Sequence, residues 1–303
     1  MMQRTERQPA GEWAARWGSA LLGVWLGCGG AAATVTAPPS ARFVSAPMEL
    51  HLMTGAGDRV QASVEVTNTS ANPLALKLYL GDSRLEPDGR ETELAPGENP
   101  RSCARWTVLR DQFLELAPGE SKPARLELEV PAGSEGSYWT KLYIEEVSMP
   151  ERSVREMGGR KYTVFMKQRL GIRLFEDVPG TGRLDATVTE VAVHEDAPGV
   201  PGVRVGVTNP GTLIARCTGK VELRDTAGKI VATLPLGSRG EFWVYPDSRR
   251  DLSAVAPGPL APGTYTALAI VDFGGDHLVA GDAIYRTAEV TLPNAHEVAE
   301  DRP

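Results

Sequence analysis

Short runs of this chain alternate apolar and polar residues with a period of two. In the run 62–68, "ASVEVTN", Val64 and Val66 fall on one face, and polar residues fall on the other. The runs 74–80, "LALKLYL", and 125–130, "RLELEV", alternate in the same way. This period is typical of β-strands that bury one face. Each run therefore predicts a half-buried strand.

Turn-forming residues separate these runs. The segments "TSANP", "EPDG", "APGE" and "PAGS" lie between them. The chain holds 32 Gly and 23 Pro residues, which interrupt every stretch with helical spacing. Strands with a turn roughly every ten residues are typical of antiparallel sandwiches. The pattern predicts an all-β fold.

One short sequence motif, called the phrase below, occurs twice in the chain. "VEVTN" stands at Val64–Asn68 and "VGVTN" at Val205–Asn209. "GSYWTKLYIEEV" (Gly136–Val147) follows the first copy, and "PGTYTALAIVDF" (Pro262–Phe273) follows the second. The repeated order predicts two tandem immunoglobulin-like β-sandwiches, with the phrases at the second and sixth strand of each. Tyr138 and Tyr265, which head the sixth strands, are either tyrosine corners or core residues.

Turn-forming segments and changes in composition divide the chain into four predicted parts. A signal segment with its spacer is expected at 1–40, a first sandwich at 41–177, a second at 183–292 and a flexible tail at 293–303. "EDVPGTG" breaks the last strand of the first sandwich and reads as the linker. In the second sandwich, "LRDTAGKIVA" predicts a hairpin in which Gly228 takes a positive φ.

One alternating run is unusually long. "YTVFMKQRLGIRLF" (Tyr162–Phe175) predicts a single strand that overhangs its sheet or lines an edge, where unpaired backbone groups invite a visiting strand. The alternative is an ordinary last strand covered by its own sheet. The candidate partner-binding residues on this run are Tyr162, Val164, Met166, Arg169 and Arg173.

The N-terminus predicts export from a bacterial cell. Three arginines precede "GSALLGVWLGCGGAAA" (Gly18–Ala33), which is too short to span a bilayer comfortably and has the layout of a secretory signal. Cleavage near Ala33 or Ala37 would release a periplasmic protein. "WLGC" also resembles a lipobox, with Cys28 as the lipidated residue of an outer-membrane lipoprotein. An uncleaved anchor is the third alternative.

The net charge and the cysteine and histidine content limit the classes of partner and cofactor that we expect. The net charge of −7 argues against nucleic acid. Apart from Cys28, the cysteines are Cys103 and Cys217, which either form one bridge or stay as two half-buried thiols. The four histidines are scattered and the chain has no CxxC, so we expect neither a metal site nor a cofactor.

No known catalytic motif is complete in this sequence. "DFG" at Asp272–Gly274 lacks the other kinase motifs, and "GTG" at Gly180–Gly182 lacks the third glycine of a dinucleotide site. "NTS" at Asn68–Ser70 has the form of a glycosylation sequon but reads better as a turn. The chain is therefore predicted not to be an enzyme.

Three stretches carry a family resemblance. "VEVTNTSANPLALKLYL", "FLELAPGESKPARLELEVP" and "SYWTKLYIEE" resemble the N-terminal domain of periplasmic pilus-assembly chaperones, and equally the WxL-interacting proteins with their two immunoglobulin-like domains. The WxL-interacting group binds cell-wall glycan or partner proteins. The chaperone resemblance implies that Tyr162–Leu174 is lent to an incomplete subunit. It also implies that Arg173, in "IRLF", binds the subunit's C-terminal carboxylate, with Arg42 as its counterpart.

Two functions follow from these observations. The first is an exported, non-enzymatic binding or scaffold protein of the cell envelope that acts through sheet edges and end loops. The alternative is a periplasmic chaperone that donates a β-strand to secreted or fimbrial subunits. Both expect a protein partner, no nucleic acid, and membrane contact only through a lipid anchor. The identity of the partner and the oligomeric state stay open.

Overall fold

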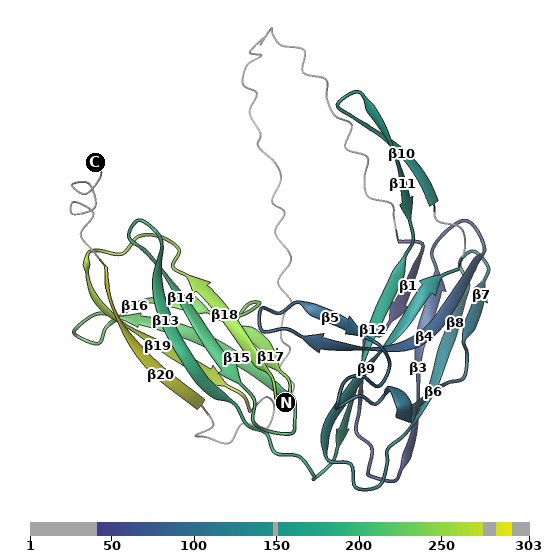
Figure 1. Cartoon of the computed structure of the whole chain (residues 1–303), viewed down its shortest axis with the longest axis horizontal. Helices are drawn as coiled ribbons and strands as arrows, with labels where there is room; N and C mark the ends of the chain where they lie inside the picture. Colours follow the sequence, from purple (N-terminus) through teal and green to yellow (C-terminus); the bar gives the residue numbers. More distant parts are fainter. Residues whose placement is uncertain (1–40, 148–150, 275–282, 293–303) are drawn as a thin grey trace, which may run out of the picture. The chain divides into compact units, whose positions relative to one another are not determined.

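The all-β prediction is confirmed by the computed structural model, which describes residues 41–147, 151–274 and 283–292 (Figure 1). Regular structure in these ranges is β-strand, apart from one short 3-10 helix. No helix within the described part of the chain is long and apolar enough to cross a membrane. The predicted signal segment at 1–40, with Cys28, and the predicted tail at 293–303 lie outside the described residues.

The first sandwich packs a four-stranded sheet against a six-stranded sheet. The smaller sheet has the order β1 (Phe43–Ala46), β3 (Arg59–Asn68), β8 (Ser121–Glu129), β6 (Thr107–Leu109). The larger has the order β2 (Glu49–Leu52), β12 (Arg169–Val178), β9 (Gly136–Glu146), β4 (Leu74–Leu85), β5 (Glu91–Leu94), and β7 (Phe113–Leu116) also pairs with β4. The 3-10 helix, η1, spans Ala104–Trp106. Of these pairs, β2 with β12 is parallel and the others are antiparallel.

The second sandwich packs a three-stranded sheet against a five-stranded sheet. The smaller has the order β13 (Thr187–Ala197), β14 (Val200–Thr208), β18 (Arg249–Val255). The larger has the order β16 (Ile230–Pro235), β15 (Ala215–Arg224), β19 (Gly263–Asp272), β20 (Ala283–Leu292), and β17 (Glu241–Val244) also pairs with β15. β15 and β16 form the predicted hairpin, and Gly228 in its turn has a φ of 79°.

The alternating runs bury the faces that their patterns predict. On β3, Val64 and Val66 are fully buried, and Glu65 between them is exposed. On β8, Leu126 and Leu128 are buried in the same manner. Burial of a Val or Leu side chain contributes about 1.5–3 kcal/mol, so these rows supply the main driving force for each sandwich.

The repeated phrase ends in a buried asparagine that plays the same part in both sandwiches. The Asn68 side chain donates to the carbonyls of Leu116 and Asn72 at 3.0 and 2.8 Å. That of Asn209 donates to Val244 and Leu213, both at 2.8 Å. Each asparagine carbonyl also accepts a backbone N–H two residues further on. The phrase therefore encodes a turn fastened into the core. Because Asn68 is fully buried, the "NTS" sequon is a turn, as expected.

The two tyrosines that head the sixth strands have different surroundings. The Tyr265 hydroxyl donates to the carbonyl of Ala261 at 2.6 Å, which is the geometry of a tyrosine corner. Tyr138 instead accepts from the amide of Glu135 at 3.3 Å and packs on Trp106, with ring centroids 4.3 Å apart. The corner prediction holds in the second sandwich, whereas Tyr138 serves packing in the first.

The prediction of one long strand over Tyr162–Phe175 is wrong. The run forms two strands, β11 (Arg160–Met166) and β12, and β11 pairs with β10 (Glu151–Met157) as a separate two-stranded ribbon. The break has a physical cause at Gln168, a polar residue at a core-facing position. Its side-chain carbonyl accepts from the amide of Arg42 at 2.8 Å, and its amide donates to the carbonyl of Phe43 at 2.7 Å. Gln168 therefore fastens the chain to the start of β1.

The predicted linker also begins later than its residues suggest. β12 continues to Val178, so Glu176 and Asp177 belong to the strand. Glu176 is fully buried, and its carboxylate accepts from the amide and the hydroxyl of Thr54 at 2.6 and 3.0 Å. A charged residue that looked like linker is held in place by this contact. The limits 41–177 and 183–292 for independently folding domains stay a prediction.

Candidate partner-binding edge

The first four residues of β12, 169–172, have an unpaired edge. β9 pairs with the whole strand, but β2 pairs only with residues 173–176. The amide of Arg173 donates to the carbonyl of Met48 at 3.1 Å, so odd-numbered residues of β12 point their backbone groups away from β9. The N–H and C=O of Arg169 and Gly171 point the same way, because backbone direction alternates along a strand. No other strand of the described chain pairs with residues 169–172.

Both ends of this unpaired stretch are fastened. Gln168 bonds to Phe43 at one end, and Arg173 bonds to Met48 at the other. The first strand of the sandwich thus passes from the smaller sheet to the larger one beside β12. Along this passage Val44 and Met48 are 44% and 46% exposed. The result is a short backbone edge, and the segment that runs between its two fastened ends carries exposed apolar side chains.

Three of the candidate residues lie on β11 rather than on the edge of the sheet. Tyr162 is 46% exposed and stands opposite Arg155 in the ribbon. Val164 and Met166 are described only by their backbone, which pairs with Ser153 and Glu151. A two-stranded ribbon by itself is only marginally stable in water. Within the described residues no third strand pairs with the ribbon, so β11 also has an unpaired edge.

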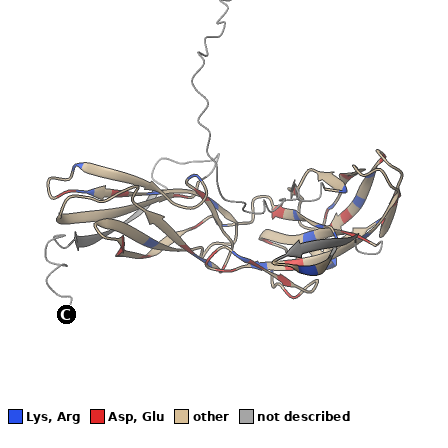
Figure 2. Cartoon of the chain, turned by 90° about the horizontal axis from the view of Figure 1, so that it is seen from above, with Lys and Arg blue, Asp and Glu red and all other residues tan. Residues whose placement is uncertain are grey.

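Arg169 and Arg173 are neutralised by acidic residues of the same sandwich. Arg173 forms ion pairs with Glu49 and Glu91 at 2.9 and 3.2 Å. Arg169 pairs with Glu93, and its guanidinium lies 4.8 Å from the ring centroid of Tyr143. Figure 2 shows basic and acidic stretches next to each other on this sandwich. The two arginines are therefore not free cations in this arrangement.

Sequence reasoning missed the partners of these arginines. Glu91 also binds Lys141, which lies on β9. Burial acts to raise the pKa of Glu91, but Lys141 and Arg173 outweigh it and hold this pKa below its usual value. The alternation of "TKLYIEE" signals that Lys141 and Tyr143 share one face, but it does not show which acid faces them.

The expected carboxylate-binding pair, Arg42 and Arg173, receives separate acidic partners. Arg42 binds Glu146 at 2.6 Å, and Glu146 is buried. Arg173 binds the two glutamates of β2 and β5. The structure brings Arg173 together with Arg169 and Lys141 on one sheet face, so these cations replace Arg42 as the neighbours of Arg173.

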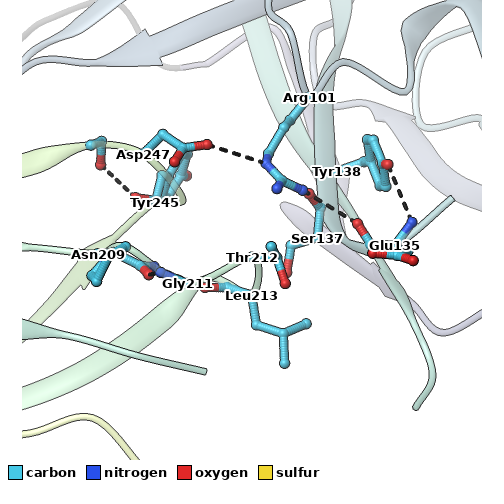
Figure 3. A network of polar contacts seen from close by, with 12 residues as sticks. Arg101, Glu135, Ser137, Tyr138, Asn209, Gly211, Thr212, Leu213, Tyr245 and Asp247 are labelled. Carbon is cyan, nitrogen blue, oxygen red and sulfur yellow. Dashed lines mark hydrogen bonds and ion pairs between the residues drawn. The ribbon is translucent and has the colours of Figure 1, made fainter. Parts of the chain in front are cut away.

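A second cluster of contacts joins β9 to the chain after β14 (Figure 3). The amide of Ser137 donates to the carbonyl of Thr212 at 2.8 Å, and its hydroxyl accepts from the amide of Ile214 at 2.9 Å. Gly136 has a φ of 76°, and a Cβ there would meet the Thr212 carbonyl at 2.3 Å. Arg101 and Asp247 add an ion pair at 3.9 Å. Glycine at 136 is therefore required for this contact.

The two cysteines within the described residues are buried thiols. Cys103 and Cys217 are free and buried, so the thiol alternative to a bridge is confirmed. Burial raises the pKa of Cys103 well above its usual value and that of Cys217 to about 12. Within the described residues no group of three or more His, Cys, Asp or Glu side chains is placed to hold a metal ion.

Comparisons with known proteins return pilus chaperones among solved structures. No family model matches the chain, and no curated protein matches it. A class 5 fimbriae chaperone, CfaA, superposes with a TM-score of 0.45 at 12% identity, over 83% of this chain and 99% of that one. The CupB2 chaperone of Pseudomonas aeruginosa superposes with a TM-score of 0.40 at 16% identity, over 82% of this chain and all (100%) of that one. At such identities and TM-scores, these similarities assign neither activity nor partner to this chain.

Proposed function

We propose that this chain is an exported, non-enzymatic protein that binds an extended segment of a protein partner along the unpaired edge of β12. The specific form of this function is that of a periplasmic chaperone for secreted or fimbrial subunits. The observation that carries the proposal is the edge at residues 169–172, which is unpaired between two fastened ends. Of the two functions expected from the sequence, this edge supports strand binding more directly than a general scaffold.

The edge has the properties that strand addition needs. Main-chain hydrogen bonds to a visiting strand supply affinity, and contacts to alternate side chains supply specificity. The backbone groups of Arg169 and Gly171 offer the hydrogen bonds, while Val44 and Met48 offer apolar contacts beside them. An edge of this kind is a liability in a protein with no use for it, because it also pairs with other copies of the chain.

The ribbon β10–β11 extends the proposed site. A partner strand that is longer than the edge of β12 would continue along β11, where Tyr162, Val164 and Met166 are the expected contacts. Replacement of the exposed Tyr162 by Ala should weaken a long partner segment and leave a short one unaffected. Equal losses for both lengths would remove β11 from the site.

The export of the chain and its lipid anchor at Cys28 are part of the proposal. The layout of the N-terminus supports both, and it leaves cleavage near Ala33 or Ala37 as the alternative. Radiolabelled palmitate should enter the chain in bacterial cells, and Cys28→Ala should abolish the label. A mature protein that begins beyond Cys28 would refute the anchor and leave the binding proposal intact.

Strand binding is tested with a synthetic decapeptide that alternates Val and Thr and carries a fluorophore at its N-terminus. The double variant Val44→Asp/Met48→Asp should weaken binding about tenfold or more in fluorescence anisotropy, because it places two charges in the apolar flank. Its melting temperature should stay close to that of the unaltered chain, since both side chains are exposed. Hydrogen exchange at the amides of Arg169 and Gly171 should slow when the peptide binds.

The matched control is Val108→Asp, on β6 of the smaller sheet, where the side chain is 56% exposed. It should leave peptide binding unchanged. Binding that is insensitive to the double variant, or exchange at Gly171 that is insensitive to the peptide, would overturn the proposal.

A further inference from the structure

Strand β5 reaches across the larger sheet to cations on β9 and β12. In the sheet order β9 and β4 separate β5 from β12, so a flat sheet would hold β5 and β12 about 14 Å apart. Yet Glu91 of β5 binds Arg173 directly at 3.2 Å, and Glu93 binds Arg169. The end of β4 and the whole of β5 therefore fold over the sheet face as a flap, which we define as residues 84–94.

A glycine allows this flap to lie close to the sheet. β4 pairs with β9 as far as Gly81, and from Asp82 onward it pairs with β5. A Cβ at position 81 would meet the ring of Tyr143 at 2.7 Å and the carbonyl of Leu94 at 3.7 Å. The absence of a side chain at Gly81 thus lets the flap turn directly above Tyr143.

Two polar groups beneath the flap are in energetically unfavourable surroundings. The Tyr143 hydroxyl is buried without a hydrogen-bond partner, and burial raises the pKa of Tyr143 to about 12. An unpaired buried hydroxyl is costly because it has lost its bonds to water. The carboxylate of Glu91 is also largely withdrawn from water, with 23% of its side chain exposed. Opening the flap would return the Glu91 carboxylate to water, but it would break the ion pairs of Glu91 and the hydrogen bond from the Asp251 amide to the Pro87 carbonyl.

We propose that the flap masks the cations of the partner site: Glu91 and Glu93 occupy the places on Arg173, Lys141 and Arg169 that a carboxylate of the bound partner would take. This inference rests on the proposed function, since it concerns the regulation of the same site. The partner that fits is an extended segment with a free C-terminal carboxylate. It displaces the flap only if its strand also pairs with the edge of β12.

In the proposed exchange, a carboxylate of the partner replaces a carboxylate of the flap on the same cations. A partner carboxylate that replaces Glu91 restores the charge-assisted bonds to Arg173 and Lys141, so the exchange itself yields little net free energy. Main-chain pairing must then decide the outcome. Free carboxylates, which lack a strand, would be excluded from the cations.

The test compares two decapeptides that alternate Val and Thr, one with a free C-terminal carboxylate and one with a terminal amide. The flap variant is Glu91→Gln/Glu93→Gln. The matched control is Glu115→Gln/Glu129→Gln, which removes the same charge outside the flap. Glu115 is exposed on β7, and Glu129 is exposed on β8, where it pairs with Arg59.

The unaltered chain and the control should bind the two peptides with similar affinity. The flap variant should bind the carboxylate peptide about tenfold more tightly and the amide peptide without change, because only the former uses the freed cations. Glu93→Gln alone provides a milder version. Its side chain is 51% exposed, so the fold should tolerate the change, and the preference for the carboxylate should shift about threefold.

Each outcome separates the two proposals. An unchanged ratio between the peptides in both flap variants would overturn the masking, while binding that still depends on Val44 and Met48 would keep the strand site. Failure of every variant to bind either peptide would overturn both.

Discussion

The two sandwiches agree at the ends of their second strands and differ at their first and last strands. Asn68 and Asn209 make equivalent buried contacts at the ends of β3 and β14. In the second sandwich β13 is one continuous strand on β14, and β20 is the edge strand of its sheet, paired only with β19 among the described strands. In the first, the corresponding first strand is divided into β1 and β2, and β2 pairs with β12, so the unpaired stretch at residues 169–172 lies between two fastened ends. The shared strands carry the fold, and the proposed function lies where the copies diverge.

The largest effect should come from the shared asparagines. Asn68→Ala and Asn209→Ala each leave buried carbonyls without donors, and each should lower the free energy of unfolding by about 2–3 kcal/mol. Urea denaturation followed by tryptophan fluorescence measures both. Asn72→Ala, at an exposed position of the first turn, is the control and should cost less than about 0.5 kcal/mol. A large cost in one copy and none in the other would break the equivalence.

A smaller effect is expected at the point where the copies diverge. Gln168→Ala removes the acceptor of the Arg42 amide and the donor to the Phe43 carbonyl. It should cost about 1–2 kcal/mol and should speed hydrogen exchange at Arg42 and Phe43 without affecting β13. Gln168→Glu keeps the acceptor and should restore slow exchange at Arg42. Unchanged exchange in the alanine variant would show that other contacts fasten β1.

The smallest effect concerns pH and the first sandwich alone. Burial raises the pKa of Glu176, against the hydrogen bonds from Thr54 that lower it. A raised carboxyl pKa contributes stability that is fully present below the unfolded pKa and is lost as pH rises through the folded pKa. Glu176→Gln should therefore gain stability relative to the unaltered chain between pH 4 and pH 7, by less than about 1 kcal/mol. Urea midpoints across this range measure it, and an opposite slope would mean that the Thr54 bonds dominate.

Alternation predicted which residues are buried but not which strands pair. The rows on β3 and β8 were correct because the two faces of a strand are a local property of the backbone. The run Tyr162–Phe175 keeps the same parity throughout, yet it divides at Gln168. The cause is a contact with Phe43, which lies far away in the sequence. A pattern that spans neighbouring residues contains no record of such a contact.

The candidate site shows the same division between local and distant information. Sequence reasoning placed Arg169 and Arg173 on the polar face of the long run, and the chaperone resemblance also singled out Arg173. Arg169 lies on the proposed edge, and Arg173 lies at its end. Sequence reasoning did not predict that Glu91 and Glu93 are the partners of these arginines. The acids and the arginines lie far apart in the chain, and no local pattern determines which of them come into contact. The ion pairs of the arginines with Glu91 and Glu93 form only because β5 folds over the sheet.

Local patterns were enough to predict the all-β class, the two copies of an immunoglobulin-like sandwich, and the turn that begins at Asn68. These follow from residue spacing and turn chemistry, which act over a few neighbouring residues. The tertiary structure decided the division of the first strand, the unpaired edge of β12 and the ion pairs that cover its cations. These depend on which distant segments compete for the same backbone and charged groups, and that competition is settled only when the whole sandwich packs.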